Sequence, residues 1–187
     1  MKELLFGTAG IPLSAKGATA DGIRHTRKLG LDAFELEFVR SINISKEKAP
    51  LIKKAAEESK VVLTCHAPYY INLNSTEIDK VEASIGRILN LARIASLCGA
   101  YSVTFHAGFY GDQKEKAYEN VKKNLKQIIS VLGEEENSIW IRPETGGKLS
   151  QFGDIDELIK ISQELDQVLP CIDWAHHFSR SLGKLNS

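Results

Sequence analysis

The sequence predicts an α/β fold in which parallel strands alternate with helices. Short runs rich in β-branched and aromatic residues alternate with longer runs whose apolar side chains recur at helical spacing. The strand-like runs recur about every 33 residues, which is the length of one strand and its crossover helix. They begin near Leu4, Ala33, Val61, Ser102, Ile139 and Val168. The 187 residues therefore hold about six such units, and we expect one domain that covers residues 1–187.

Amphipathic segments supply the helices between these strands. The clearest covers residues 76–97, with Thr76 as a candidate N-cap, Asp79 three residues later and Gly99 as a candidate terminator. A first helix around His25 precedes the second strand, and we expect His25 to be exposed to solvent. The other helical segments are residues 46–59, 115–132 and 155–165. Strands joined by helices run parallel, so their carboxyl ends lie together.

Two parallel architectures fit this pattern: an open doubly wound sheet and a closed eight-stranded barrel. Eight units need roughly 260 residues, so the strand count alone favours the open sheet. A barrel of six strands would leave two open edges, which further sequence or a partner would have to cover. The choice therefore depends on the residues at the strand ends.

Composition excludes several classes of protein. Lys+Arg and Asp+Glu both number 24, so there is no global basic excess of the kind that holds proteins to nucleic acid by charge. Three widely spaced cysteines predict no disulfide framework; Cys65 should face the helices and Cys171 the barrel interior. The apolar run at residues 4–6 is too short for a signal peptide or a spanning helix. We expect a cytoplasmic protein without membrane association.

Metal-ligand residue types follow four successive strands. They are His66, His106, Glu144 and Asp173, with His176 three residues after Asp173. In a closed barrel the carboxyl ends of the strands converge on one point, so this pattern favours the barrel. Histidine and carboxylate donors without thiolates suit zinc or manganese, and Glu144 can bridge two ions. Paired ions about 3.5–4 Å apart are the usual device for phosphodiester or amide hydrolysis.

Each of these residues also has a structural interpretation. A single histidine at a strand end is often only hydrogen-bonded. Glu144 can pair with a nearby cation, and Asp173 can cap a following helix. His177 cannot share the direction of its neighbour, so we expect it at the surface or behind the ligands.

Four motifs resemble the endonuclease IV group of apurinic/apyrimidinic endonucleases, within the xylose-isomerase-like TIM barrel superfamily. The motifs are His66–Leu73, Phe105–Gly108, Glu144–Gly147 and Cys171–His176. The resemblance implies a (β/α)8 barrel, of which this sequence supplies about six β/α units. It also implies cleavage of damaged double-stranded DNA on the 5′ side of an abasic site, as in base excision repair, by a cluster of up to three zinc ions.

The resemblance also implies roles for individual residues. His66, His106 and Glu144 would hold one zinc ion, with Glu144 as the catalytic bridge to a second. Asp173 would bind the second ion and His176 a third.

On the DNA side, the resemblance makes Tyr69 the aromatic residue that enters the duplex beside the abasic nucleotide, and Arg40 a probe of the minor groove. Further cations near the strand ends could add a phosphate footprint. They are Lys46, Lys148, Arg180 and Lys184.

Two alternatives stay open. A sugar isomerase or epimerase of the same superfamily would use one divalent ion and a carboxylate base, for which Glu35 and Glu37 share one face of the second strand. A truncated barrel without catalytic activity is the other. The resemblance places further ligands on a seventh and an eighth strand, so we expect this sequence to be the amino-terminal part of a longer barrel, monomeric when complete.

Overall fold

The computed structural model describes residues 4–184, so Met1, Lys2 and Glu3 lie outside the described residues. Its strands are β1 (Gly7–Ala9), β2 (Ala33–Glu37), β3 (Val62–His66), β4 (Ser102–Phe105) and β5 (Trp140–Pro143). Its helices are α1 (Thr19–Lys28), α2 (Ala49–Ser59), α3 (Ile78–Leu97), α4 (Lys114–Glu134), α5 (Ile155–Glu164) and α6 (Trp174–Arg180). The α/β prediction is therefore confirmed.

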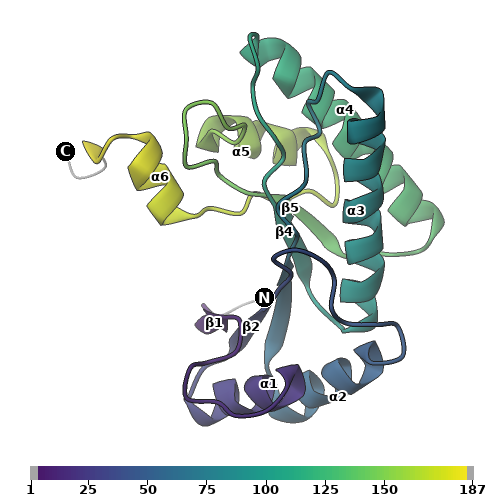
Figure 1. Cartoon of the computed structure of the whole chain (residues 1–187), viewed down its shortest axis with the longest axis vertical. Helices are drawn as coiled ribbons and strands as arrows, with labels where there is room; N and C mark the ends of the chain where they lie inside the picture. Colours follow the sequence, from purple (N-terminus) through teal and green to yellow (C-terminus); the bar gives the residue numbers. More distant parts are fainter. Residues whose placement is uncertain (1–3, 185–187) are drawn as a thin grey trace.

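The strands form one parallel sheet in the order β1-β2-β3-β4-β5. This order never reverses, whereas a doubly wound sheet reverses at its switch point. Figure 1 shows α1 to α4 wrapped around one side of the curved sheet, with α6 standing away from it. This is the strand order of consecutive units in a β/α barrel, the architecture that the strand-end residues favoured over the open sheet.

The sixth predicted strand pairs with β5 but is interrupted. Leu169 N donates to the Ile141 carbonyl and Cys171 N to the Pro143 carbonyl, both at 3.0 Å. Pro143 has no N–H, so the intervening ladder bond cannot form. The pairing is reduced to two isolated bridges, from Val168 to Ile141 and from Cys171 to Glu144.

Several element boundaries differ from the sequence predictions, among them the start of α2, which lies at Ala49 rather than near Lys46. The first strand begins at Gly7 rather than near Leu4. The helix predicted from Thr76 begins at Ile78 with Glu77 as its N-cap, so the Thr76 cap is wrong. Its other end is as predicted: Gly99 adopts φ +74°, the left-handed conformation that ends many helices.

The core lies between the sheet and the helices that cover it. Phe34, Leu63, Phe105 and Ile141 come from four adjacent strands and are at most 1% exposed. Cys65 is buried in the same layer, as predicted. Truncating a residue such as Phe105 to alanine should cost about 3–5 kcal/mol. The core thus holds the strand ends in fixed relative positions.

The other face of the sheet is polar. The Thr64 hydroxyl donates to Glu35 at 3.2 Å, and the Arg142 guanidinium donates to the Pro170 carbonyl at 2.8 Å. Cys171 is half-buried on this side, and its pKa lies above the ordinary value because of burial. Among the described residues, no helix has the length and apolar character needed to cross a lipid bilayer.

Candidate metal centre

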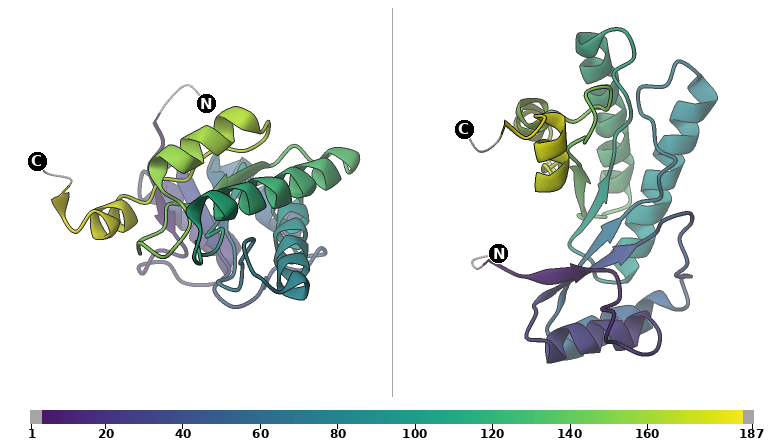
Figure 2. Two further views of the ribbon diagram at one scale, coloured as in Figure 1. Left: turned by 90° about the horizontal axis from the view of Figure 1, so that it is seen from above. Right: turned by 60° about the vertical axis from the view of Figure 1, so that its left-hand side comes forward.

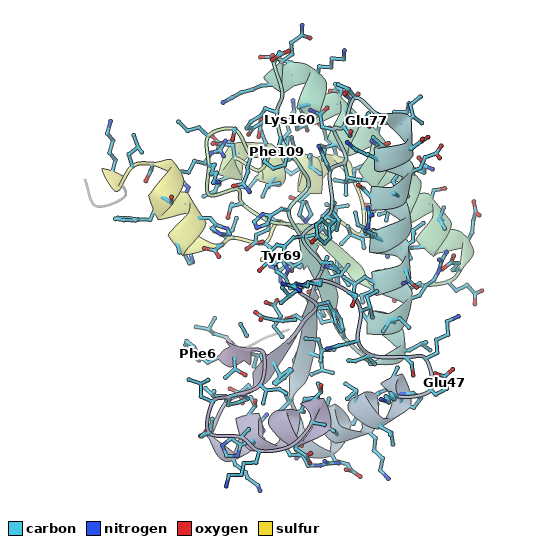
Figure 3. The ribbon with its side chains drawn as sticks, viewed as in Figure 1. Phe6, Glu47, Tyr69, Glu77, Phe109 and Lys160 are labelled. Carbon is cyan, nitrogen blue, oxygen red and sulfur yellow. The ribbon has the colours of Figure 1, made fainter. Side chains whose placement is uncertain are left out.

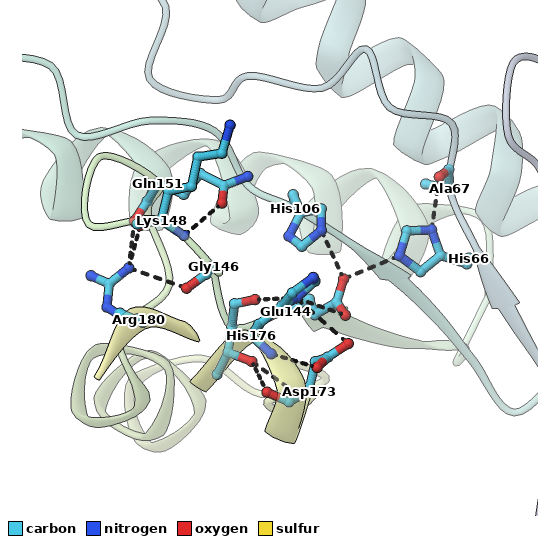
Figure 4. A network of polar contacts seen from close by, with 11 residues as sticks. His66, Ala67, His106, Glu144, Gly146, Lys148, Gln151, Asp173, His176 and Arg180 are labelled. Carbon is cyan, nitrogen blue, oxygen red and sulfur yellow. Dashed lines mark hydrogen bonds and ion pairs between the residues drawn. The ribbon is translucent and has the colours of Figure 1, made fainter. Parts of the chain in front are cut away.

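Five donor side chains meet at the carboxyl ends of the strands. We call His66, His106, Glu144, Asp173 and His176 the candidate metal centre (Figure 4). His66 ends β3, while His106 and Glu144 directly follow β4 and β5. Since these strands are parallel and adjacent, their last residues lie side by side. The sequence prediction that these residues converge agrees with the geometry; their role as metal ligands stays a prediction.

Glu144 lies between two groups of ligands. Its Oε2 is 3.1 Å from His66 Nε2 and 3.2 Å from His106 Nε2. Its Oε1 is 3.6 Å from His176 Nδ1, which is also 3.6 Å from Asp173 Oδ2. We call His66, His106 and Glu144 the strand group, and Glu144, Asp173 and His176 the helix group. In each group the ligand atoms lie within 4.8 Å of one another, close enough to hold one ion.

The helix group is held in place by Thr145. Its hydroxyl accepts a hydrogen bond from Asp173 N at 2.9 Å and donates to the Asp173 carbonyl at 3.2 Å. Asp173 is the N-cap of α6, and its Oδ1 accepts from His176 N at 2.8 Å. Asp173 therefore caps the helix, as the structural interpretation expected, and its Oδ2 also faces His176.

Backbone carbonyls orient two of the three histidines. His66 Nδ1 donates to the Ala67 carbonyl at 2.9 Å, and His176 Nδ1 donates to the Thr145 carbonyl at 3.0 Å. In His66 this bond fixes the tautomer that leaves Nε2 facing Glu144 as the ligand atom, as is typical of metal-binding histidines. In His176 the nitrogen that donates to the carbonyl is the same one that faces Glu144 and Asp173, so an ion bound through Nδ1 would replace this hydrogen bond. His106 Nδ1 is buried and has no hydrogen-bond partner within residues 4–184.

The carboxylate at the centre shifts the pKa values of its neighbours. Burial alone would lower the pKa of His66, but the bonds to Glu144 and to the Ala67 carbonyl raise it to about 9. Burial lowers the pKa of His106 by more than the charge of Glu144 raises it. Burial also raises the pKa of Glu35, against the opposing effect of His66. At neutral pH the His66 ring is therefore protonated, and its Nε2–H faces Glu144 Oε2.

A cleft of about 290 Å³ opens above these side chains. Tyr69 lies on its wall with 67% of its surface exposed (Figure 3). Glu35 and Glu37 line the wall formed by β2. Arg40 is exposed just beyond this wall and does not line the cleft. The full lining is Ala9, Glu35, Glu37, Phe38, Val39, His66, Ala67, Tyr69, His106, Glu144, Asp173 and His176.

One predicted surface cation is not available to a ligand. Arg180 is only 8% exposed and donates hydrogen bonds to backbone carbonyls, so the prediction that it contributes to a phosphate footprint is wrong. Lys46 and Lys148 are exposed. His25 is half-buried rather than fully exposed, and its Nε2 lies 2.8 Å from the Ser14 hydroxyl.

Sequence reasoning missed Thr145 and the structural use of Arg180. Thr145 follows Glu144 in the motif, and that adjacency was the available signal. Arg180 bonds backbone carbonyls, which no residue pattern reveals.

Comparison with known proteins points to one family. A sequence model of the family described as xylose isomerase-like TIM barrel matches residues 23–186. An uncharacterized protein of Methanocaldococcus jannaschii is 42% identical over 98% of this chain and 66% of its own length. A probable endonuclease 4 of Cenarchaeum symbiosum is 27% identical over 91% of this chain and 64% of its own length. The chain thus spans about two thirds of these relatives.

Two solved structures share the fold at low identity. Endonuclease IV from Thermus thermophilus superposes with a TM-score of 0.72 at 21% identity, over 91% of this chain and 64% of the other. A D-tagatose 3-epimerase-like protein superposes with a TM-score of 0.74 at 16% identity, over 93% of this chain and 66% of the other. Both support a xylose isomerase-like barrel as the fold.

Proposed function

The chain belongs to the xylose isomerase-like TIM barrel family, and from that premise we propose that it takes part in divalent-metal-dependent hydrolysis of DNA backbones beside abasic sites. The observation that carries the proposal is the shared carboxylate Glu144. One of its oxygens faces His66 and His106, and the other faces His176. Two ligand groups joined by one carboxylate suit a pair of ions, which is the arrangement that phosphodiester hydrolysis uses.

The donor chemistry fits zinc. Three imidazoles and two carboxylates, without a thiolate, form the two groups, and Mn²⁺ is the second choice. When bound, such ions supply Lewis acidity to a phosphoryl oxygen and lower the pKa of water. The chain's part is to hold the ligands: Thr145 fixes Asp173, and the Ala67 carbonyl orients His66.

The exposed wall of the cleft suits a distorted duplex. Tyr69 stands beside the candidate metal centre with most of its ring exposed. An aromatic ring in this position can replace the stacking lost at an abasic nucleotide. The curated relatives at 23–28% identity that are named probable endonuclease 4 support this substrate.

The test uses a duplex with one tetrahydrofuran abasic analogue and a label at its 5′ end. The wild-type protein loaded with Zn²⁺ should nick on the 5′ side of the analogue and leave a 3′-hydroxyl. Nicking should stop with a chelator and in Glu144→Gln, and should continue in Asp166→Asn, which changes an exposed carboxylate outside the cleft. Loaded protein that leaves the analogue intact would contradict the proposal.

A second candidate is epimerisation or isomerisation of a small sugar. Glu35 and Glu37 add two carboxylates to the cleft, and none of the described residues lining it is Lys or Arg. That lining suits a neutral polyol better than a phosphate. Burial raises the pKa of Glu35, which favours its use in proton transfer beside a carbonyl. Conversion of a ketohexose by protein that leaves abasic DNA intact would decide for this function.

A further inference from the structure

A buried arginine fastens the far end of α6. Arg180 is the last residue of this helix, and its Nη1 donates to three carbonyls of the loop between β5 and α5. The acceptors are Gly146 at 3.3 Å, Lys148 at 2.8 Å and Gln151 at 3.0 Å (Figure 4). The loop that it binds begins at Glu144, the shared carboxylate.

The other two guanidinium nitrogens of Arg180 also have partners. Nη2 donates to the Tyr110 hydroxyl at 3.0 Å, and that hydroxyl donates to the Glu157 carboxylate. Nε lies 3.4 Å from Asp154 Oδ2. The planar fork of a guanidinium can meet several acceptors at fixed angles, which a lysine ammonium cannot.

Within residues 4–184, few other contacts hold α6 in position. The helix has seven residues, and helices of this length are not stable alone. Its apolar residues Trp174 and Phe178 are 69% and 48% exposed, so they contribute little burial. Figures 1 and 2 show α6 projecting from the sheet and the other helices. Its place therefore depends on polar contacts at its two ends, Thr145 at one and Arg180 at the other.

We propose that Arg180 is a positioning residue for the helix group of the candidate metal centre, an inference that rests on the proposed function. Asp173 and His176 lie at the start of the helix that Arg180 ends. Glu144 lies at the start of the loop that Arg180 binds. The guanidinium joins these two segments and so holds Asp173 and His176 opposite Oε1 of Glu144.

Loss of this guanidinium should affect only half of the centre. Three carbonyls would lose a buried donor, which favours movement of α6 toward water. His66 and His106 come from β3 and β4, which the core holds. The strand group should therefore keep its ion while the helix group loses its own.

The first measurement is the number of Zn²⁺ ions per chain after equilibrium dialysis. We expect two for the wild type and one for Arg180→Met, with at least a tenfold weaker affinity for the second ion. Arg180→Lys should bind the second ion with intermediate affinity. Arg93→Met is the matched control, because Arg93 pairs with Glu135 on the surface of α3 and α4. Two ions with unchanged affinity in Arg180→Met would overturn the inference.

A second measurement needs no metal. His176 Nδ1–H and His66 Nδ1–H both donate to backbone carbonyls, so nuclear magnetic resonance can follow their exchange with solvent. In Arg180→Met the His176 proton should exchange at least tenfold faster, while the His66 proton stays unchanged. Tyr110→Phe, which removes one acceptor of Arg180, should act in the same direction with a smaller effect.

The two proposals fail in different ways. A wild type that binds no zinc would contradict the proposed function, and the exchange rates would still test Arg180. Equal acceleration at His66 and His176 would mean general loss of structure and would overturn the positioning role. An unchanged His176 rate in Arg180→Met would overturn it as well.

Discussion

Substitution of Glu144 by glutamine tests the shared carboxylate most directly. Glu144→Gln keeps the size of the side chain and removes its charge. Because Glu144 belongs to both the strand group and the helix group, the affinity for both ions should fall. Loss of a ligand's supporting group typically weakens metal affinity by about 10–100-fold, and loss of a direct ligand lies at the upper end of that range.

The expected size follows from ligand linkage. An ion present at about 100 times its dissociation constant raises the free energy of unfolding by roughly 2.7 kcal/mol, so two ions add about 5 kcal/mol. With both affinities about 100-fold weaker, the same concentration adds only about 1 kcal/mol. For a chain of this length, each kcal/mol is worth about 2–4 °C in Tm. A rise of roughly 10–20 °C on addition of Zn²⁺ should fall to about 2–4 °C.

The assay is thermal unfolding with and without Zn²⁺. Glu37→Gln is the control, because Glu37 lines the same cleft and belongs to neither ligand group. It should keep the full rise in Tm. If Glu144→Gln also keeps it, Glu144 is not a ligand; if half remains, only one group depends on Glu144. Either result would refute the shared-carboxylate reasoning.

Three further outcomes follow from the same geometry. Because the pKa of His66 is raised to about 9, an ion that binds the strand group must displace a proton from His66. The apparent affinity for Zn²⁺ should therefore fall by about tenfold for each pH unit below 9. Competition with a chelating dye measures this affinity. Tyr69→Ala should weaken binding to an abasic duplex by roughly tenfold to a hundredfold, measured by fluorescence anisotropy. Tyr70 is about equally exposed but lies outside the cleft, so Tyr70→Ala should leave this binding unchanged. Equal effects of the two substitutions would exclude a specific role for Tyr69. Gly153 has φ +115°, and an added Cβ would lie 2.5 Å from the Glu144 carbonyl oxygen. Gly153→Ala should therefore lower the free energy of unfolding, measured in urea, by about 2 kcal/mol or more. An unchanged free energy of unfolding would show that this loop adapts to the added methyl group.

Patterns among neighbouring residues were enough to predict much of the fold. Residues 155–165 were predicted as a helix and α5 covers Ile155–Glu164, because an apolar stripe and a capping residue lie within a few positions of each other. The predicted Thr76 cap was wrong because several neighbouring residues can serve as the N-cap. Thr76 lies two residues before the true helix start, and the sequence alone does not decide which residue caps the helix.

The sixth strand shows where a local pattern is insufficient. Its residues pair with β5 as a strand should, but Pro143 on the partner removes a ladder bond. Strand propensity describes one segment, whereas a ladder depends on two.

The sequence by itself determined the alternation of strands and helices and the histidine or carboxylate that follows four of the strands, because both depend on residues adjacent along the chain. The tertiary structure decided that Glu144 directs one oxygen to His66 and His106 and the other to His176, and that Arg180 is buried against carbonyls. These contacts join residues 29 to 78 positions apart, so they follow from sheet register and from the path of the loop after β5. Register and loop path come from the packing of the whole chain, and no short segment of the sequence contains them.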